Sequence, residues 1–276
     1  MFPEFIAEEY WGRRLGKWSE SLDNMTDEEK ELFSKMYDGN PPSSITPEKA
    51  NELRALIENK WDQQGVIGSC VHKVIELYFS KGLNIGKGFN LIVRKELEQF
   101  VDKEINSNAR KLEGKRAYTL DEIVPKNSTM INDAIEIAKK LKDSLESTFG
   151  PDLRYFPEFK LTAKLTQEVK EANELIGTID LVVLDNKGNV HVVDFKTSPK
   201  NYNSATEYSS VKKNVIRHQL AAYSRMLAYN GLNKPENRML VVPIQIENFK
   251  PLNNEMYTYT GLKENISNTI FDDLTN

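Results

Sequence analysis

Cysteine is almost absent from this chain. Its 276 residues include a single cysteine, Cys70, so the chain cannot form an internal disulfide or supply a four-cysteine zinc or iron–sulfur site. We therefore expect a protein of a reducing compartment without an iron–sulfur cluster, in which Cys70 is a small buried apolar residue.

The chain also lacks a strong excess of one charge and any long apolar run. Its formal net charge is −4, so it is not a basic protein that coats nucleic acid, and a DNA contact would need a local patch. No segment is apolar over the length of a bilayer, and the first residues, MFPEFIAEEYWGRRLGKW, lack a secretory signal pattern. We expect no membrane association and a cytoplasmic location.

A nucleotide-binding loop is excluded as well. The segment GLNIGKG has three residues between Gly82 and Gly86 and no Ser or Thr after Lys87, whereas a phosphate-binding loop needs four residues and then Lys-Ser or Lys-Thr. We expect no nucleotide cofactor.

Helical periodicity dominates the first part of the chain. The sequence predicts helices over about 47–62, 68–82 and 128–150, opened by Thr46 with Pro47 in the first case and by Ser128 in the last. Residues 83–127 give a weaker pattern, with a helix over about 91–105, and we interpret this region as an insertion. A later helix is predicted over about 209–230.

Period-two alternation appears in 155–165, 175–185 and 189–198, and the last two segments are joined by the hairpin turn Asn186-Lys187-Gly188. Further strands are predicted over 238–248 and 255–262. We expect an α/β (mixed α+β) fold with a central mixed sheet flanked by helices. The predicted domains are a helical N-terminal region (1–65), a core (66–262, with the insertion at 83–127) and a C-terminal tail (263–276).

Two of these predicted strands contain aspartate residues. Alternation places Asp194 and Lys196 on one face of their strand, and Asp180 on one face with Thr178 and Val182 of the neighbouring strand. Two carboxylates that meet there would repel unless a cation lay between them. Oxygen ligands favour Mg²⁺ or Mn²⁺, and a nearby lysine can orient a water, which is the chemistry of phosphodiester hydrolysis.

A plainer interpretation of the same residues is a half-exposed sheet. Asp180 and Asp194 would then be solvated, with Lys196 as a surface ion-pair partner of little energetic value.

The order of four short motifs favours the first interpretation. GSCVH (68–72), GTID (177–180), DFK (194–196) and HQLAAY (218–223) together resemble the PD-(D/E)XK nuclease superfamily, and specifically its RecB-type exonuclease branch. The resemblance implies a restriction-endonuclease-like fold. Many cellular relatives carry iron–sulfur cysteines or a fused helicase, and this sequence has neither, which implies a stand-alone nuclease or a subunit.

The resemblance also implies roles for individual residues. His72, Asp180, Asp194 and the backbone carbonyl of Phe195 would hold one Mg²⁺ or Mn²⁺ ion, and Lys196 would be the catalytic lysine.

Three further residues match less central parts of the family pattern. Gln219 and Tyr223 correspond to a Q-x-x-x-Y element that lies beside the metal and helps to position substrate. Glu158 corresponds to an extra acidic residue that some members place near the site, where it would help a second ion.

Other histidines and acids have structural alternatives. A histidine on a mostly apolar helix is often a hydrogen-bonded core residue, which is the alternative for His72. Glu76, one turn later, is either an acceptor for that imidazole or a solvated residue. His191 faces away from Asp194 and is predicted to be structural, and His218 lies beside the Gln219 face.

A local patch of basic residues would indicate where the DNA binds. Lys212 and Lys213 stand near the start of a helix, where cations are slightly unfavourable, so a bound phosphate would explain them better than helix stability. With Arg217, Gln219 and Tyr223 they form the predicted DNA-binding set. The alternative is a solvated helix end, with the basic stretch from Arg110 to Arg116 as the next candidate.

The sequence therefore predicts a metal-dependent DNA nuclease, most simply an exonuclease of recombination, repair or phage DNA metabolism in a bacterial or phage-infected cell. The alternatives are a structure-selective endonuclease and a module of this fold that binds nucleic acid or a partner without cutting. DNA is the expected partner, with a protein subunit or a second copy of the chain as further candidates.

Overall fold

The structure of this protein is a computed structural model. It describes residues 47–81, 88–107, 115–126, 128–164, 174–198 and 210–247, and three short strands at 250–251, 257–258 and 261–264. The chain divides into two compact units, one formed by residues 1–65 and 250–258 and the other by residues 66–249 and 259–276. The predicted domain boundaries remain predictions. None of the described helices combines the length and the apolar character that crossing a membrane requires.

A single helix, α3 (Pro47–Lys81), runs through both segments in which the sequence predicts separate helices. The predicted break near Gly65 is wrong. One glycine inside a helix costs only about 1 kcal/mol relative to alanine, and without a proline the backbone hydrogen bonds continue. Pro47 is the first helical residue, as predicted, while Thr46 lies outside the described residues.

Between residues 88 and 150, the described residues form three helices and a π-helical turn. Helix α4 (Phe89–Phe100) continues into the π-helical turn Val101–Ile105, which together match the helix predicted over 91–105. Helix α6 (Leu120–Ile123) is short. Helix α7 (Met130–Phe149) ends before Gly150 as predicted and begins two residues after the predicted start at Ser128. Ser128 Oγ accepts a hydrogen bond from Met130 N at 3.1 Å at its start.

Five strands form one mixed sheet in the order β1-β2-β3-β4-β7. The antiparallel strands β1, β2 and β3 are followed by β4 parallel to β3 and by β7 antiparallel to β4. Their bounds are β1 (Arg154–Lys164), β2 (Glu174–Leu184), β3 (Val190–Ser198), β4 (Met239–Glu247) and β7 (Gly261–Glu264). The expected mixed sheet flanked by helices is confirmed.

Two short elements complete the list of described strands. β5 (Lys250–Pro251) and β6 (Tyr257–Thr258) pair with each other and belong to the first unit. The strand predicted over 255–262 therefore corresponds in part to β6 and β7. The β2–β3 hairpin is confirmed, and Asp185 Oδ1 closes its turn by accepting hydrogen bonds from Lys187 N at 2.9 Å and Asn189 N at 2.8 Å.

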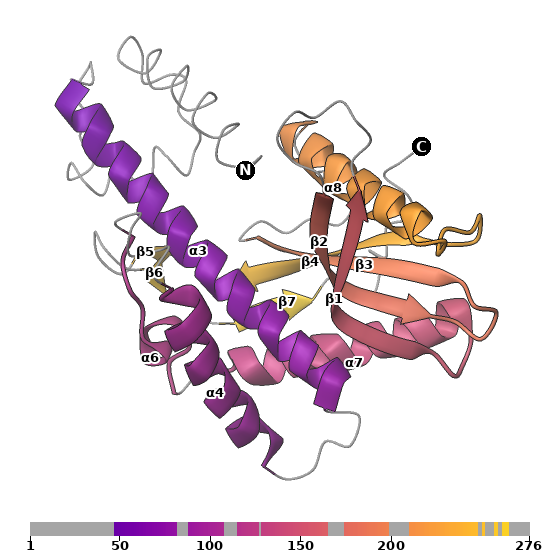
Figure 1. The fold of residues 1–276 in the computed structure, drawn as a ribbon. Coiled ribbons are helices and arrows are strands. Elements are labelled where there is room, and N and C mark those ends of the chain that lie inside the picture. Colours follow the sequence, from indigo (N-terminus) through magenta and orange to yellow (C-terminus); the bar gives the residue numbers. More distant parts are fainter. Residues whose placement is uncertain are drawn as a thin grey trace. The chain divides into compact units, whose positions relative to one another are not determined.

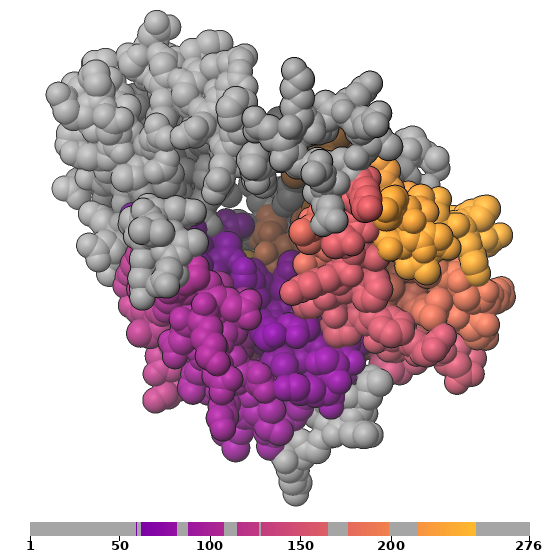
Figure 2. Space-filling model, viewed as in Figure 1, coloured from indigo at the N-terminus to yellow at the C-terminus, as the bar shows by residue number. Residues whose placement is uncertain are grey.

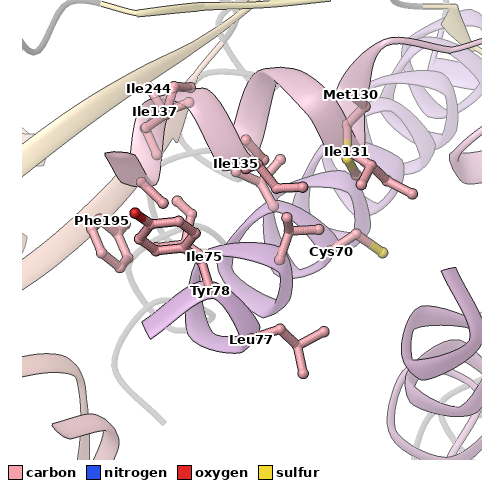
Figure 3. Close-up of a cluster of buried hydrophobic side chains, with 14 of the residues drawn as sticks. Cys70, Ile75, Leu77, Tyr78, Met130, Ile131, Ile135, Ile137, Phe195 and Ile244 are labelled. Atoms are coloured by element: carbon pink, nitrogen blue, oxygen red, sulfur yellow. The ribbon is translucent and has the colours of Figure 1, made fainter. Parts of the chain in front are cut away.

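Two apolar clusters cover the two faces of the sheet. The larger cluster joins α3, α4 and α7 to one face, and Figure 3 shows Ile75 and Tyr78 of α3 near Ile135 and Ile137 of α7 and Phe195 of β3. The smaller cluster joins helix α8 (Ser210–Tyr229) to the opposite face, where α8 lies in Figure 1. Asp194, which lies between the clusters, is consequently shielded from water.

Helix α3 touches β3 directly at Gly68. A Cβ atom at this position would overlap Thr197 Oγ1, so the helix and the strand approach more closely than a side chain would permit. His72 follows one turn after Gly68, and Lys196 precedes Thr197. The contact therefore fixes the distance between two parts of the candidate site.

We expect Gly68→Ala to lower the free energy of unfolding by about 1–3 kcal/mol, because the added methyl group overpacks this contact. Urea denaturation measures the change. Gly65→Ala is the matched control on the same helix, since a Cβ atom there meets no atom within 4 Å, and it should raise the free energy of unfolding by up to about 1 kcal/mol. Adding Thr197→Ala to Gly68→Ala should restore most of the loss. An unchanged stability of Gly68→Ala would contradict the close approach.

Candidate active site

The candidate site begins where β2 and β3 stop pairing. Their antiparallel ladder runs from Leu184 and Val190 to Leu181 and Val193, and the next pair in register, Asp180 with Asp194, is not formed. Instead, Phe195 N donates a hydrogen bond to Asp180 Oδ2 at 2.7 Å. The carboxylate thus replaces a strand carbonyl as the acceptor at the point where the two strands part.

The pairing of β2 with its other neighbour, β1, is also interrupted at Asp180. Glu158 of β1 stands across from Asp180 in register, but this pair is missing from a ladder that is formed on both sides of it. Glu158 has a φ of 49°, in the left-handed region. A non-glycine residue in this region is strained by about 1–2 kcal/mol, so the local distortion coincides with the candidate site.

The distortion changes the side of the sheet to which β2 residues point. Ile179 and Val182 pack in the cluster with α8, whereas Leu181 packs in the cluster with α3 and α7. Asp180 reaches His72 of α3, so the prediction that Asp180 shares a face with Val182 is wrong. Strict alternation fails here because the backbone of the paired strand is left-handed at one residue.

Asp194 is completely buried. Lys196 Nζ lies 2.5 Å from Asp194 Oδ2 as an ion pair, while Oδ2 accepts no hydrogen bond of regular geometry. Gln219 Nε2 donates to Oδ1 at 3.1 Å. Burial raises the pKa of Asp194 to about 6, the Lys196 ammonium opposes this rise, and the Asp180 carboxylate adds to it. The interpretation of Asp194 as a solvated sheet residue is therefore wrong.

A hydrogen-bonded relay links Asp194 to β2. Gln219 Nε2 also donates to Tyr223 OH at 2.9 Å, and that hydroxyl donates to the Thr178 carbonyl oxygen at 2.8 Å. All three protons are used within the relay. Tyr223 is 6% exposed, and burial raises its pKa to about 12. Gln219 and Tyr223 thus lie beside the acidic pair, as the resemblance implies, with their amide and hydroxyl protons committed to protein oxygens.

Gly177 packs against α8 beside this relay. A Cβ atom on Gly177 would lie 2.5 Å from Met226 Cε, the flexible end of that side chain, and 3.4 Å from Tyr223 Cε1. A larger residue would therefore displace the end of Met226, which gives the glycine of the GTID motif a packing role that the sequence does not reveal.

His72 lies on α3 beside the two aspartates. Its Nδ1 is 3.8 Å from Asp180 Oδ2, and its ring meets the edge of Phe195 with centroids 5.5 Å apart. Burial and the Lys196 ammonium lower the pKa of His72 to about 4, against the opposing effect of Asp194. The imidazole is therefore neutral at neutral pH, which is the form that can bind a metal.

Glu158 and Glu76 form an acidic rim. Partial burial raises the pKa of Glu158 to about 7, followed by the effects of the Asp180 and Glu76 carboxylates. Glu76 Oε2 accepts a hydrogen bond from Lys73 Nζ at 2.6 Å. Glu76 is thus paired with a lysine, and neither of its two predicted roles describes it.

The predictions for His191 and Cys70 are confirmed. His191 is buried, its Nδ1 accepts from Arg238 N at 3.2 Å, and its ring stacks on Phe149 at 3.7 Å. Cys70 is buried, and burial raises the pKa of its thiol to about 12. Both residues are structural.

The predicted DNA-binding residues are described only in part. Lys212 and Lys213 lie in the first turn of α8, but their side chains are outside the described residues. Arg217 and His218 are exposed on the same helix. Of the stretch from Arg110 to Arg116, residues 110–114 are also outside the described part.

The donor set fits a hard divalent ion. Among the described residues, no three His, Cys, Asp or Glu side chains already converge into a metal site. Mg²⁺ does not need such a cage, because one or two carboxylates, waters and substrate phosphates commonly complete its ligands. The Asp194 carboxylate beside Lys196, the Asp180 carboxylate and the neutral His72 imidazole provide compatible donors.

A mixed sheet flanked by helices thus holds two aspartates, a lysine and a histidine where the pairing of β2 and β3 ends. The model of the PD-(D/E)XK nuclease superfamily matches residues 47–269, and the chain belongs to this superfamily. Nucleases of this superfamily generally use divalent metal ions such as Mg²⁺. No curated protein matches the chain.

We expect Asp194→Asn to stabilise the metal-free protein above pH 6. The folded state binds the Asp194 proton more tightly than the unfolded chain, whose carboxyl has an ordinary pKa of 3.8. Native stability therefore falls as the pH rises through the range between these two pKa values. Asparagine cannot ionise, so the free energy of unfolding should rise by roughly 1–3 kcal/mol at pH 7.5 and by much less at pH 4.5.

Urea denaturation in a chelating buffer at both pH values measures this difference. The same substitution at exposed Asp152 is the control and should change the free energy of unfolding by less than about 0.5 kcal/mol at either pH. A gain at Asp194 that is equal at both pH values would contradict the buried, proton-linked carboxylate.

Proposed function

We propose that this chain is a metal-dependent DNA exonuclease of the RecB-type branch that acts in recombination, repair or phage DNA metabolism. The observation that carries the proposal is the ion pair of Lys196 with buried Asp194 at the point where β2 and β3 part. A buried carboxylate held beside a lysine has no evident use in a module that only binds DNA.

In this proposal, His72, Asp180, Asp194 and the carbonyl of Phe195 hold one divalent ion, and Glu158 helps a second. Mg²⁺ or Mn²⁺ would supply positive charge to the phosphate oxygens and lower the pKa of a water. The Gln219–Tyr223 relay keeps the Asp194 carboxylate in one orientation. Preorganisation of this kind avoids reorientation during the reaction.

In this proposal, Lys196 is the residue that contacts the attacking water. Its ammonium is held by Asp194 and can donate hydrogen bonds to the water oxygen and to a phosphate oxygen. The water oxygen forms the new bond to phosphorus, the bond to the leaving oxygen breaks, and a proton passes to that oxygen. The lysine thereby fixes the direction of attack and stabilises charge on the phosphate.

Digestion of matched linear, nicked and closed circular DNA tests the proposed activity. With Mg²⁺ or Mn²⁺ we expect the linear DNA to shorten from its ends while the closed circle survives, because an exonuclease needs an end. Cutting of the closed circle would assign an endonuclease instead. Binding of all three DNAs without any cleavage would assign the non-cleaving module.

We expect Lys196→Ala to lose at least about 100-fold in single-turnover cleavage, because it removes a group that acts in the transition state. Mn²⁺ affinity, measured by calorimetry at pH 8, should stay within a few-fold, since no metal ligand is changed. Lys95→Ala, at an exposed position of α4, is the control and should cleave normally. Cleavage by Lys196→Ala at the rate of the unmodified chain would overturn the role of Lys196.

A further inference from the structure

A cleft of about 490 Å³ adjoins the candidate active site. Its walls come from α3, from β1 and β2, and from the end of α4 with the π-helical turn. The lining residues are Ser69, His72, Lys73, Glu76, Phe100, Glu104, Glu158, Lys160 and Thr178. In Figure 2 the indigo surface of α3 lies between the magenta surface of α4 and the red surface of β1. This volume suits a group the size of one nucleotide and is too small for a segment of duplex.

One wall of the cleft carries a lysine close to the parted strands. Lys160 of β1 pairs in register with Thr178 of β2, and each lies two residues from Glu158 or Asp180, which is about 6.6 Å along a strand. Lys160 is exposed and has no ion-pair partner within the described part of the chain. Its ammonium and the Thr178 hydroxyl can both donate to a phosphate next to the one that is cut.

The far wall carries an aromatic ring on an unusual backbone. Phe100 is the last residue of α4, and the π-helical turn that follows places Glu104 on the same wall. Phe100 is partly buried, and Lys73 Nζ lies 5.8 Å from its ring centroid. A partly exposed ring in a nucleotide-sized cleft can stack on a base of any sequence.

The distribution of charge in the cleft determines how a bound nucleotide is oriented. Lys73 is paired with Glu76, so Lys160 is the lysine of the lining that is left for a phosphate. Glu104 lies on the wall of Phe100, where a carboxylate repels phosphate but can accept hydrogen bonds from the amino groups of bases. The phosphate therefore belongs at the β1 wall and the base at the wall of α4.

We propose that this cleft binds an unpaired nucleotide of the DNA strand being cut, with its phosphate on Lys160 and Thr178 and its base on Phe100. The proposal rests on the proposed function and adds the substrate class to it, namely a strand that is single-stranded next to the cleavage point. A base within a duplex cannot reach Phe100 unless it leaves the stack.

Fluorescence anisotropy in Ca²⁺ tests the proposal with a labelled oligodeoxythymidine and a labelled hairpin duplex of equal charge. Lys160→Ala should weaken binding of the single strand several-fold and lower the slope of log affinity against log salt by about 0.7. Phe100→Leu, which keeps an apolar side chain against the core, should weaken single-strand binding roughly fivefold or more. Binding of the hairpin should change less than twofold in both variants.

Lys164→Ala is the matched control, because Lys164 is an exposed lysine of the same strand that does not line the cleft. It should leave both affinities unchanged. Unchanged single-strand affinity in Lys160→Ala and Phe100→Leu, or an equal loss for the hairpin, would overturn the proposal.

A second measurement is independent of the folding of any variant. A single strand containing 5-bromodeoxyuridine should photo-crosslink to the wild-type chain at Phe100 or at the α3 residues of the cleft, as mapped by mass spectrometry. Crosslinks confined to other surfaces would overturn the assignment. Failure of the wild-type chain to cut any DNA would reject the proposed nuclease function, and it would not alter these binding results.

Discussion

The rest of the site depends on one constraint, which is the burial of the Asp194 carboxylate where two strands stop pairing. Burial of a charge is unfavourable unless other groups compensate it. Here the compensation comes from Lys196 on the same strand and from Gln219 on α8. The raised pKa of Asp194 indicates that these two groups compensate the charge incompletely, so a further cation beside Asp194 would be favourable.

Two glycines lie where the helices pack on the sheet. Gly68 lets α3 approach β3 closely, and Gly177 leaves room on β2 for the end of Met226 of α8. Helix α8 then supplies the amide of Gln219 from one face of the sheet, and α3 supplies His72 from the other. Both glycines belong to motifs that carry a candidate ligand, so packing and chemistry constrain the same short segments of the sequence.

Much of the site could be predicted because strand and helix periods determine which side chains are neighbours. The alternation of β3 correctly places Asp194 with Lys196, and helical spacing places Gln219 with Tyr223. The left-handed backbone at Glu158 could not be predicted, because no residue type near it requires that conformation. The sequence also could not predict that the Thr178 carbonyl accepts a hydrogen bond from Tyr223, because every residue has a carbonyl group that could do so.

The cleft illustrates a different limit of sequence reasoning. Its lysines, its aromatic ring and its carboxylates come from elements far apart in the chain, and apart from Glu158 none of them matches the family pattern. Their meeting depends on the path of α3 across β1 and α4, which the pattern of a single helix does not contain. Because Lys196 is proposed to act at the phosphate that is cut, the neighbouring phosphates need other cations. Lys160 is such a cation, and its place on an edge strand lets it bind a phosphate without burying its charge.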